Sequence, residues 1–109
     1  MSEVEDFKIA KILDAVKDPV RMQILFFLIE NGSTNVGDIA GQFHITRPAI
    51  SHHLKVLKNA EVVTSEKKGQ QVYYSPNSRM VAEGLRKLAD KIESKHNAVR
   101  KRLSGRAKD

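Results

Sequence analysis

The stretch from Thr46 to Ala60, TRPAISHHLKVLKNA, constrains the fold of this chain more than any other part of the sequence. At about 100° per residue, its apolar side chains fall on one side of a helix and its basic and hydroxyl-bearing side chains on the other. Thr46 is suited to be the N-cap, and Pro48 then falls in the first turn, where its missing N–H costs little. The sequence therefore predicts a helix that packs on one side and presents polar groups on the other.

The polar side of this predicted helix carries the kinds of group that contact DNA. Arginine makes bidentate contacts to guanine edges, serine and histidine hydrogen-bond bases or phosphates, and lysine adds positive charge. The residues of the helix predicted to contact DNA are Thr46, Arg47, Pro48, Ser51, His52 and Lys55. An ordinary amphipathic helix with a solvated basic side fits this window equally well, so the flanking sequence has to decide.

A second, shorter helical pattern lies directly upstream, from Asn35 to Phe43. Its apolar residues recur at helical spacing, Asn35 is a candidate cap, and only two residues separate the pattern from Thr46. Two short helices on so tight a turn are typical of a helix-turn-helix, whose second helix enters the major groove of DNA while the first braces it. This arrangement, over residues 35–60, favours the DNA-binding interpretation.

Beyond Ala60 the pattern changes from that of a helix to that of strands. Two β-prone runs, 62–67 and 70–75, are separated by Lys68-Gly69, which predicts a two-residue hairpin turn. A hairpin with a basic, amide-rich tip after a helix-turn-helix is a wing, here over residues 62–75, and a simple solubilising turn is the alternative. The wing residues predicted to contact DNA are Lys67, Lys68, Gln70 and Gln71.

Two more helical patterns precede the helix-turn-helix, and a long one follows the hairpin. Glu5–Lys17 has apolar residues at helical spacing, and Val20–Glu30 is so strongly apolar that we expect it to be the central buried helix. The last helix is predicted over about 78–103, with a frayed basic tail over 104–109. The whole pattern predicts one winged helix-turn-helix domain over residues 1–109, mainly α with a small β-hairpin.

Composition limits the function. The 109 residues include no cysteine, which excludes disulfides, thiolate nucleophiles and cysteine-ligated zinc. We recognise no glycine-rich phosphate loop, no paired carboxylates in an apolar setting and no Ser/His/Asp arrangement, so we expect neither an enzyme nor a bound cofactor. No signal peptide or membrane-spanning run is visible, so we expect a cytoplasmic protein without a membrane partner.

The formal net charge of +6 is unevenly distributed along the chain. Residues 1–18 hold three basic and five acidic side chains, residues 44–75 hold five and two, and residues 78–109 hold ten and four. A positive field over the predicted reading helix, wing and last helix fits a polyanion such as double-stranded DNA and speeds encounter with it. Charge alone is weak support, because many proteins of similar charge bind no nucleic acid.

Three stretches of the sequence are distinctive: DPVRMQIL at 18–25, ISHHLKVL at 50–57 and GQQVYYS at 69–75. They resemble the signature sequences of the ArsR/SmtB family of winged-helix repressors. RPAISHHL followed by NAEVV is similar to the SdpR-like autorepressor branch of that family. The resemblance implies a homodimer that binds an operator and blocks transcription. It also implies that the first and last helices form the dimer interface.

The last helix has a feature that suits this implication, because its apolar residues are spaced like the seam of a helix that packs on another helix. Left exposed, such a seam would be too large an apolar patch for an ordinary monomer. A two-fold dimer places two reading helices about 34 Å apart, so the operator is expected to be an inverted repeat. The predicted interface residues are Ile9, Ile12, Leu13, Val81, Leu85, Leu88 and Ile92.

Many members of that family sense metal ions through two types of site, and the matching positions in this chain lack the ligands. The cysteines of the first type are replaced by Asn35 and Gly37. The aspartate and histidine ligands of the second type are replaced by Ser78, Met80, Lys91 and Ser94. We therefore predict no metal site. The alternative is a shifted set of ligands, Asp90, Glu93 and His96, duplicated across a dimer to hold a metal ion. Charged residues that simply face solvent are the commoner explanation of such a set.

The two adjacent histidines have different predicted roles. His52 lies on the polar side of its helix and is the better contact to a base or phosphate, whereas His53 lies toward the packed side and is expected to be a half-buried, hydrogen-bonded core residue.

Two functions of the whole protein remain open. One is a dimeric, sequence-specific repressor, with an unidentified inducer or anti-repressor protein as a further partner. The other is an interaction module that keeps the winged-helix scaffold to bind an acidic protein.

Overall fold

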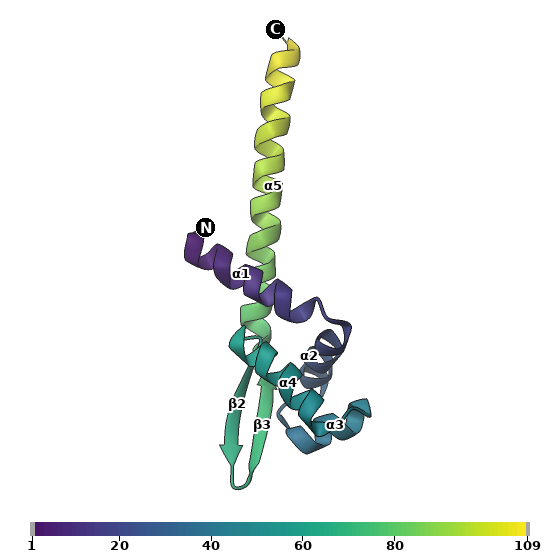
Figure 1. Cartoon of the computed structure of the whole chain (residues 1–109). Coiled ribbons are helices and arrows are strands. Elements are labelled where there is room, and N and C mark those ends of the chain that lie inside the picture. Colours follow the sequence, from purple (N-terminus) through teal and green to yellow (C-terminus); the bar gives the residue numbers. More distant parts are fainter. Residues whose placement is uncertain (1, 109) are drawn as a thin grey trace.

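A computed structural model describes the backbone of residues 2–108 and the side chains of residues 2–105. Five helices and three strands follow one another in these residues: α1 (Glu3–Val16), α2 (Pro19–Asn31), β1 (Thr34–Asn35), α3 (Val36–Phe43), α4 (Arg47–Asn59), β2 (Val63–Lys68), β3 (Gln71–Pro76) and α5 (Ser78–Lys108). The described part measures 70 × 24 × 21 Å, because α5 extends far beyond the other elements (Figure 1). The predicted winged helix-turn-helix fold, mainly α with a small sheet, is confirmed.

Each of the first four helices begins at a polar side chain that accepts a hydrogen bond from the backbone N–H three residues further on. These caps are Ser2, Asp18, Asn35 and Thr46. A side chain of this kind satisfies one of the N–H groups that the first turn of a helix leaves without a partner. The predicted caps of the two helix-turn-helix helices, Asn35 and Thr46, are confirmed.

The core lies where α1, α2, α3 and α4 meet the base of the hairpin. Its fully buried large side chains are Ile12, Ile24, Leu28, Ile39, Ile50, Leu54, Leu57, Val62 and Val63. The prediction that α2 is a central buried helix is only half right, because α2 buries one side and leaves the other open. The large apolar residues exposed on α2 are Met22, Phe26 and Ile29.

The three strands form an antiparallel sheet in the order β1-β3-β2. In the hairpin, Val63 pairs with Pro76 and Lys68 pairs with Gln71, so the turn residues are Gly69 and Gln70. The predicted turn, Lys68-Gly69, is therefore wrong by one residue. Gly69 has a φ of 62°, and glycine with positive φ at the first central position is the arrangement of a type II′ turn.

The predicted frayed tail is also wrong, because α5 continues as a helix to Lys108 instead of ending near 103. The sequence after Leu103 includes arginine, alanine and lysine, which are good helix formers, and the single Gly105 costs only about 1 kcal/mol relative to alanine. Asp109 lies outside the described residues.

Candidate nucleic-acid interface

The turn between α3 and α4 sets the direction of the reading helix. α3 ends at Phe43, its C-cap His44 has a left-handed φ of 53°, and α4 starts three residues after His44, at Arg47. The Phe43 ring packs edge-on against Phe27 of α2, with 5.8 Å between ring centres, and this contact holds the end of α3. Because α4 buries Ile50, Leu54 and Leu57 completely, its opposite side has to face outward.

That outward side is the one predicted to contact DNA. All six predicted residues of this region are exposed: Thr46, Arg47, Pro48, Ser51, His52 and Lys55. Every charged side chain between Arg47 and Asn59 is basic. The sequence analysis missed Lys58, which is exposed and follows Lys55 by three residues on the same side of α4. The spacing of three residues between Lys55 and Lys58 would have been enough to predict that Lys58 lies on the same side of the helix.

The wing supplies a second set of exposed donors beside α4. Lys67, Lys68, Gln70 and Gln71 are all exposed at its tip. The ammonium group of Lys68 lies 5.2 Å from the centre of the Tyr73 ring, close enough for a cation–π contact that holds the lysine over β3. Tyr73 is thus a supporting residue that the sequence analysis missed, because the contact depends on the register of the hairpin.

The expectation that His53 is a half-buried, hydrogen-bonded core residue is only partly met. It is half-buried as predicted, but its Nδ1 atom is buried without a hydrogen-bond partner among the described residues. The nearby Asp18 carboxylate caps α2 instead. The pKa of Asp18 is lowered, chiefly because the carboxylate accepts a hydrogen bond from the Arg21 N–H; burial opposes this shift, and the charges of Arg21 and His53 add to it.

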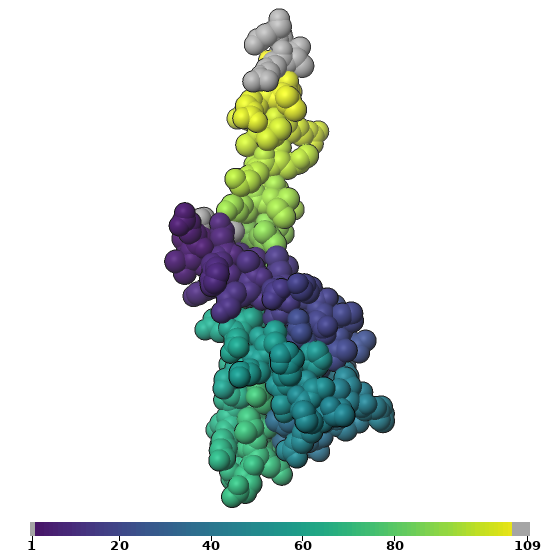
Figure 2. Space-filling model, viewed as in Figure 1, coloured from purple at the N-terminus to yellow at the C-terminus, as the bar shows by residue number. Residues whose placement is uncertain are grey.

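Reading helix and wing lie together at one end of the molecule. Figure 2 shows the helix-turn-helix and the hairpin at the end opposite the C-terminus, and α4 packs on β2. The predicted contact residues of α4 and the wing tip present guanidinium, ammonium, hydroxyl, imidazole and amide groups, which bond base edges and phosphates. Asp38 of α3 and Glu66 of β2 are exposed acidic residues at the same end. The fold and this surface define a winged helix-turn-helix DNA-binding protein.

Comparisons with known proteins lead to the same class. The sequence profile of the family described as "Bacterial regulatory protein, arsR family" matches residues 18–65. The transcriptional repressor SdpR of Bacillus subtilis (strain 168) is 40% identical over 86 residues, which cover 79% of this chain and 94% of SdpR. The chain therefore belongs to the ArsR family, and it is a DNA-binding transcriptional repressor of the ArsR/SmtB type rather than an enzyme.

Solved structures agree with this family. The structure of a "Possible transcriptional regulator for arsenical resistance" superposes with a TM-score of 0.66 at 33% identity, covering 75% of this chain and 83% of that one. NolR from Sinorhizobium fredii superposes with a TM-score of 0.64 at 30% identity, covering 83% and 92%. In both comparisons part of this chain lies outside the shared region.

The predicted dimer-interface residues fall into two groups. Ile9, Ile12 and Val81 are buried within the chain itself, with exposed fractions of 4%, 1% and 7%, because α1 packs across the first half of α5. These three side chains therefore already have a surface to cover within the chain, and their place in a dimer interface stays a prediction. Gly84 permits this close packing, since a Cβ built there would lie 3.0 Å from Ile12 Cδ1.

Three of the other four predicted interface residues, Leu13, Leu88 and Ile92, line a groove that is open to solvent. Leu13, Leu85 and Ile92 are exposed, and Leu88 is half-buried. The groove has a volume of about 330 Å³ and a mainly apolar floor between α1 and α5, and its lining includes Ala10, Leu13, Leu88 and Ile92. Lys91, which occupies an aligned metal-ligand position, pairs at its edge with Asp6 at 2.9 Å.

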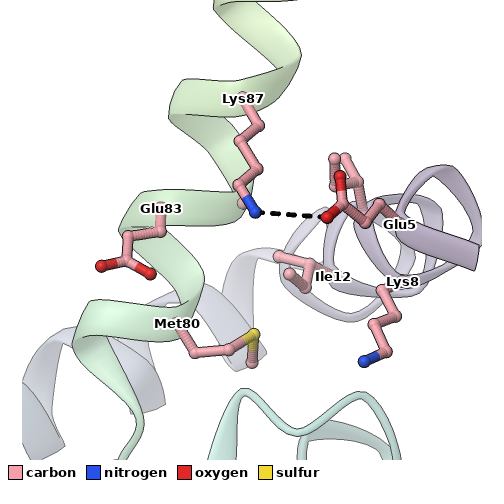
Figure 3. Close-up of a pocket in the computed structure, with 8 residues that line it drawn as sticks. Glu5, Lys8, Ile12, Met80, Glu83 and Lys87 are labelled. Carbon is pink, nitrogen blue, oxygen red and sulfur yellow. Dashed lines mark hydrogen bonds and ion pairs between the residues drawn. The ribbon is translucent and has the colours of Figure 1, made fainter. Parts of the chain in front are cut away.

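A smaller cavity of about 190 Å³ lies between α1 and α5, lined by residues that include Ile9, Ile12 and Met80. Figure 3 shows Lys87 of α5 reaching toward Glu5 of α1 at its edge, with 3.5 Å between Nζ and Oε1. This pair and the Lys91–Asp6 pair connect α1 to α5.

Among the residues that the structure describes, no three histidine or acidic side chains gather where they would hold a metal ion. Asp90, Glu93 and His96 are exposed and follow one another along α5. The prediction that the protein has no metal site is thus left for experiment.

No helix between residues 2 and 108 is long and apolar enough to cross a membrane.

Proposed function

We propose that this repressor acts as a homodimer that places two α4 helices in successive major grooves of an inverted-repeat operator. The observation that carries the proposal is the exposed side of α4, which holds only basic and neutral polar groups and lies beside the wing. Arg47, Ser51 and His52 are assigned to base edges, because the N-terminal part of a reading helix enters the groove.

The remaining predicted contacts are assigned to the phosphate backbone. Lysine carries charge without a fixed hydrogen-bonding pattern, and hydroxyl and amide groups at the edge of the interface commonly bond phosphate oxygens. These residues are Thr46, Pro48, Lys55, Lys67, Lys68, Gln70 and Gln71, with Pro48 supporting close approach through its small ring.

Binding to an operator also implies that the protein is located in the cytoplasm, where the DNA is. We assign release of the protein from its operator to an inducer or anti-repressor protein, because the family's metal ligands are replaced in this chain.

The proposed dimer interface is the groove bordered by Leu13, Leu88 and Ile92, together with Leu85. Three observations support it: the mainly apolar floor of the groove, the 60% exposure of Ile92, and the 41% exposure of Leu13 on the facing helix. A second copy would cover these side chains and remove apolar surface from water, at roughly 25 cal/mol per Å². A two-fold dimer also doubles the length of DNA that is read.

The test joins oligomeric state to operator binding. Fragments bound by the protein are first selected from genomic DNA, and the operator found in this way is titrated while sedimentation measures mass. Ile92→Glu should give folded monomers with at least about tenfold weaker operator binding, because it places a charge in the apolar seam. Phe26→Glu, at an exposed position of α2, is the matched control and should stay dimeric. A wild-type monomer at micromolar concentration that binds the operator tightly would refute the dimer.

A further inference from the structure

The distal half of α5 carries most of the net positive charge of this protein. Residues 94–109 contain six basic side chains and one acidic one, whereas residues 1–93 contain thirteen basic and twelve acidic ones. Every described residue from Ile92 to Gly105 is exposed. The ion pairs of α5 with α1 among the described residues, at Lys87 and Lys91, both lie before this segment. The domain that reads DNA is almost neutral, and the charge extends away from it (Figure 1).

Hydrogen-bonding and basic side chains gather on one face of this segment. The distal basic face consists of Asn97, Arg100, Lys101 and Ser104, which are spaced i, i+3, i+4 and i+7. These four residues and Gly105 line one shallow hollow of the surface. Arginine, lysine, asparagine and serine are side chains that commonly bond phosphate oxygens in protein–DNA complexes. The face therefore has both the charge and the donors for a phosphate backbone.

Apolar side chains occupy a different face of the same segment. Ile92, Val99 and Leu103 are 60%, 42% and 55% exposed and lie roughly a third of a turn from the distal basic face. This stripe continues the groove at Leu88 that the proposed function assigns to the dimer. Covering the stripe with a second copy would leave the distal basic face outward and accessible.

We propose that the distal basic face is a second, sequence-independent binding site for the phosphate backbone of duplex DNA, separate from α4 and the wing. The proposal rests on the proposed function, since the operator brings a duplex to the protein. A dimer concentrates two such faces on one particle, and bound phosphates relieve the repulsion between them. Anionic membrane is the less favoured surface, because the exposed stripe contains no aromatic residue.

The length of the molecule determines which DNA the face meets. Wing tip and C-terminus lie at opposite ends of a chain that is 70 Å long. A duplex of about 20 base pairs has that length at 3.4 Å per base pair. The phosphates at the distal basic face belong either to DNA that flanks the operator or to a second duplex.

The experiment measures how operator affinity depends on salt for a short duplex of about 20 base pairs and a long one of about 60. Arg100→Gln/Lys101→Gln should make the log–log slope for the long duplex less steep by about 2 per chain, because two phosphate contacts are lost. Lys95→Gln/Arg102→Gln removes the same charge beside the apolar stripe and should change the slope by less than half as much. Arg100→Lys/Lys101→Arg keeps the charge and should behave as wild type.

The outcomes separate the two sources of phosphate. An effect confined to the long duplex assigns the face to flanking DNA, whereas an effect on the short duplex, with two duplexes per dimer in sedimentation, assigns it to a second duplex. Unchanged slopes at both lengths, with wild type still binding the operator, overturn the inference and leave the proposed function intact. Failure of wild type to bind any operator refutes the proposed function itself.

Three other results also overturn the inference. The first is that both double neutralisations reduce the slope equally, since net charge alone would then explain the effect. The second is a changed sedimentation mass or lost helical circular dichroism in Arg100→Gln/Lys101→Gln. The third is that this variant keeps full DNA affinity but loses binding to vesicles of phosphatidylglycerol and phosphatidylcholine.

Discussion

The guanidinium group of Arg21 donates to the carbonyl oxygen of Ala15, with 2.6 Å between Nε and O. A second nitrogen of the same group, Nη2, donates to the carbonyl oxygen of Asp14 at 3.3 Å. Both carbonyls belong to the last turn of α1, where they have no N–H partner within the helix. Arg21 therefore satisfies the end of α1 from the first turn of α2 and holds the two helices at their junction.

We expect Arg21→Gln to lower the free energy of unfolding by about 1–3 kcal/mol, because two carbonyls lose a charged donor. Urea denaturation followed by circular dichroism measures the change. Arg86→Gln, which neutralises an exposed arginine of α5, is the control and should shift stability by less than about 0.5 kcal/mol. Equal unfolding midpoints for Arg21→Gln and wild type would show that the junction does not depend on these bonds.

The Asp18 cap should make stability depend on acid pH. Its pKa lies below the ordinary value of 3.8, chiefly because the carboxylate accepts a hydrogen bond from the Arg21 N–H. A carboxyl group with a lowered folded pKa stabilises the protein above its unfolded pKa, and this stability is lost as pH falls through the folded value. Asp18→Asn keeps a capping oxygen that does not titrate, so it should lose less stability than wild type between about pH 5 and pH 3. Parallel curves for the two proteins would contradict this.

Within the reading helix, Arg47→Ala and Ser51→Ala should relax the sequence preference of binding. A lost base contact costs about 1–3 kcal/mol at one base pair and leaves binding to other sequences less affected. Titration of the operator and of single-base-pair variants measures the preference. Our assignment fails if both proteins discriminate among these duplexes as wild type does.

The wing should behave in the opposite way. Lys68→Ala should weaken binding to every duplex by a similar factor and make the salt slope less steep by about 1 per chain, because a phosphate contact carries no sequence information. Tyr73→Leu should have a smaller effect of the same kind, since it removes only the ring under the Lys68 ammonium group. A changed base preference in either variant would reverse the roles of wing and helix.

Zinc, nickel or cobalt should leave operator affinity unchanged, because the residues at both aligned sets of family ligand positions do not provide the required ligands. The measurement compares operator titrations with each metal at moderate excess and with chelator. A reproducible change of about tenfold or more (roughly 1.4 kcal/mol), lost in Asp90→Ala or His96→Ala, would point instead to the shifted set on α5.

Local patterns were enough to predict the elements that read DNA. The apolar spacing of α3 and α4, the caps Asn35 and Thr46, and the exposed polar side of α4 all depend on residues within one or two turns of each other. A helix with one strongly apolar side has to bury it, so the direction of the other side follows from the sequence. The ArsR/SmtB resemblance likewise rested on short local stretches, at 18–25, 50–57 and 69–75.

Several errors came where contacts join distant residues, whereas the end of α5 and the role of Lys58 were missed in local sequence. The hairpin turn was misplaced by one residue because register depends on how β3 pairs with β1 and β2 together, not on the turn alone. The unpartnered Nδ1 of His53 and the cation–π contact of Lys68 with Tyr73 likewise depend on how separate elements pack.

The sequence by itself determined which side of α4 carries polar groups and faces outward, since that follows from helical periodicity over short stretches. Only the tertiary structure decided how the apolar residues of α1 and α5 are divided. An apolar spacing shows that a surface must be covered, but it does not show whether the cover comes from the same chain or from another copy. The close approach of α1 at Gly84 buries Ile9, Ile12 and Val81 within one chain, whereas Ile92 stays exposed in the open groove between α1 and α5.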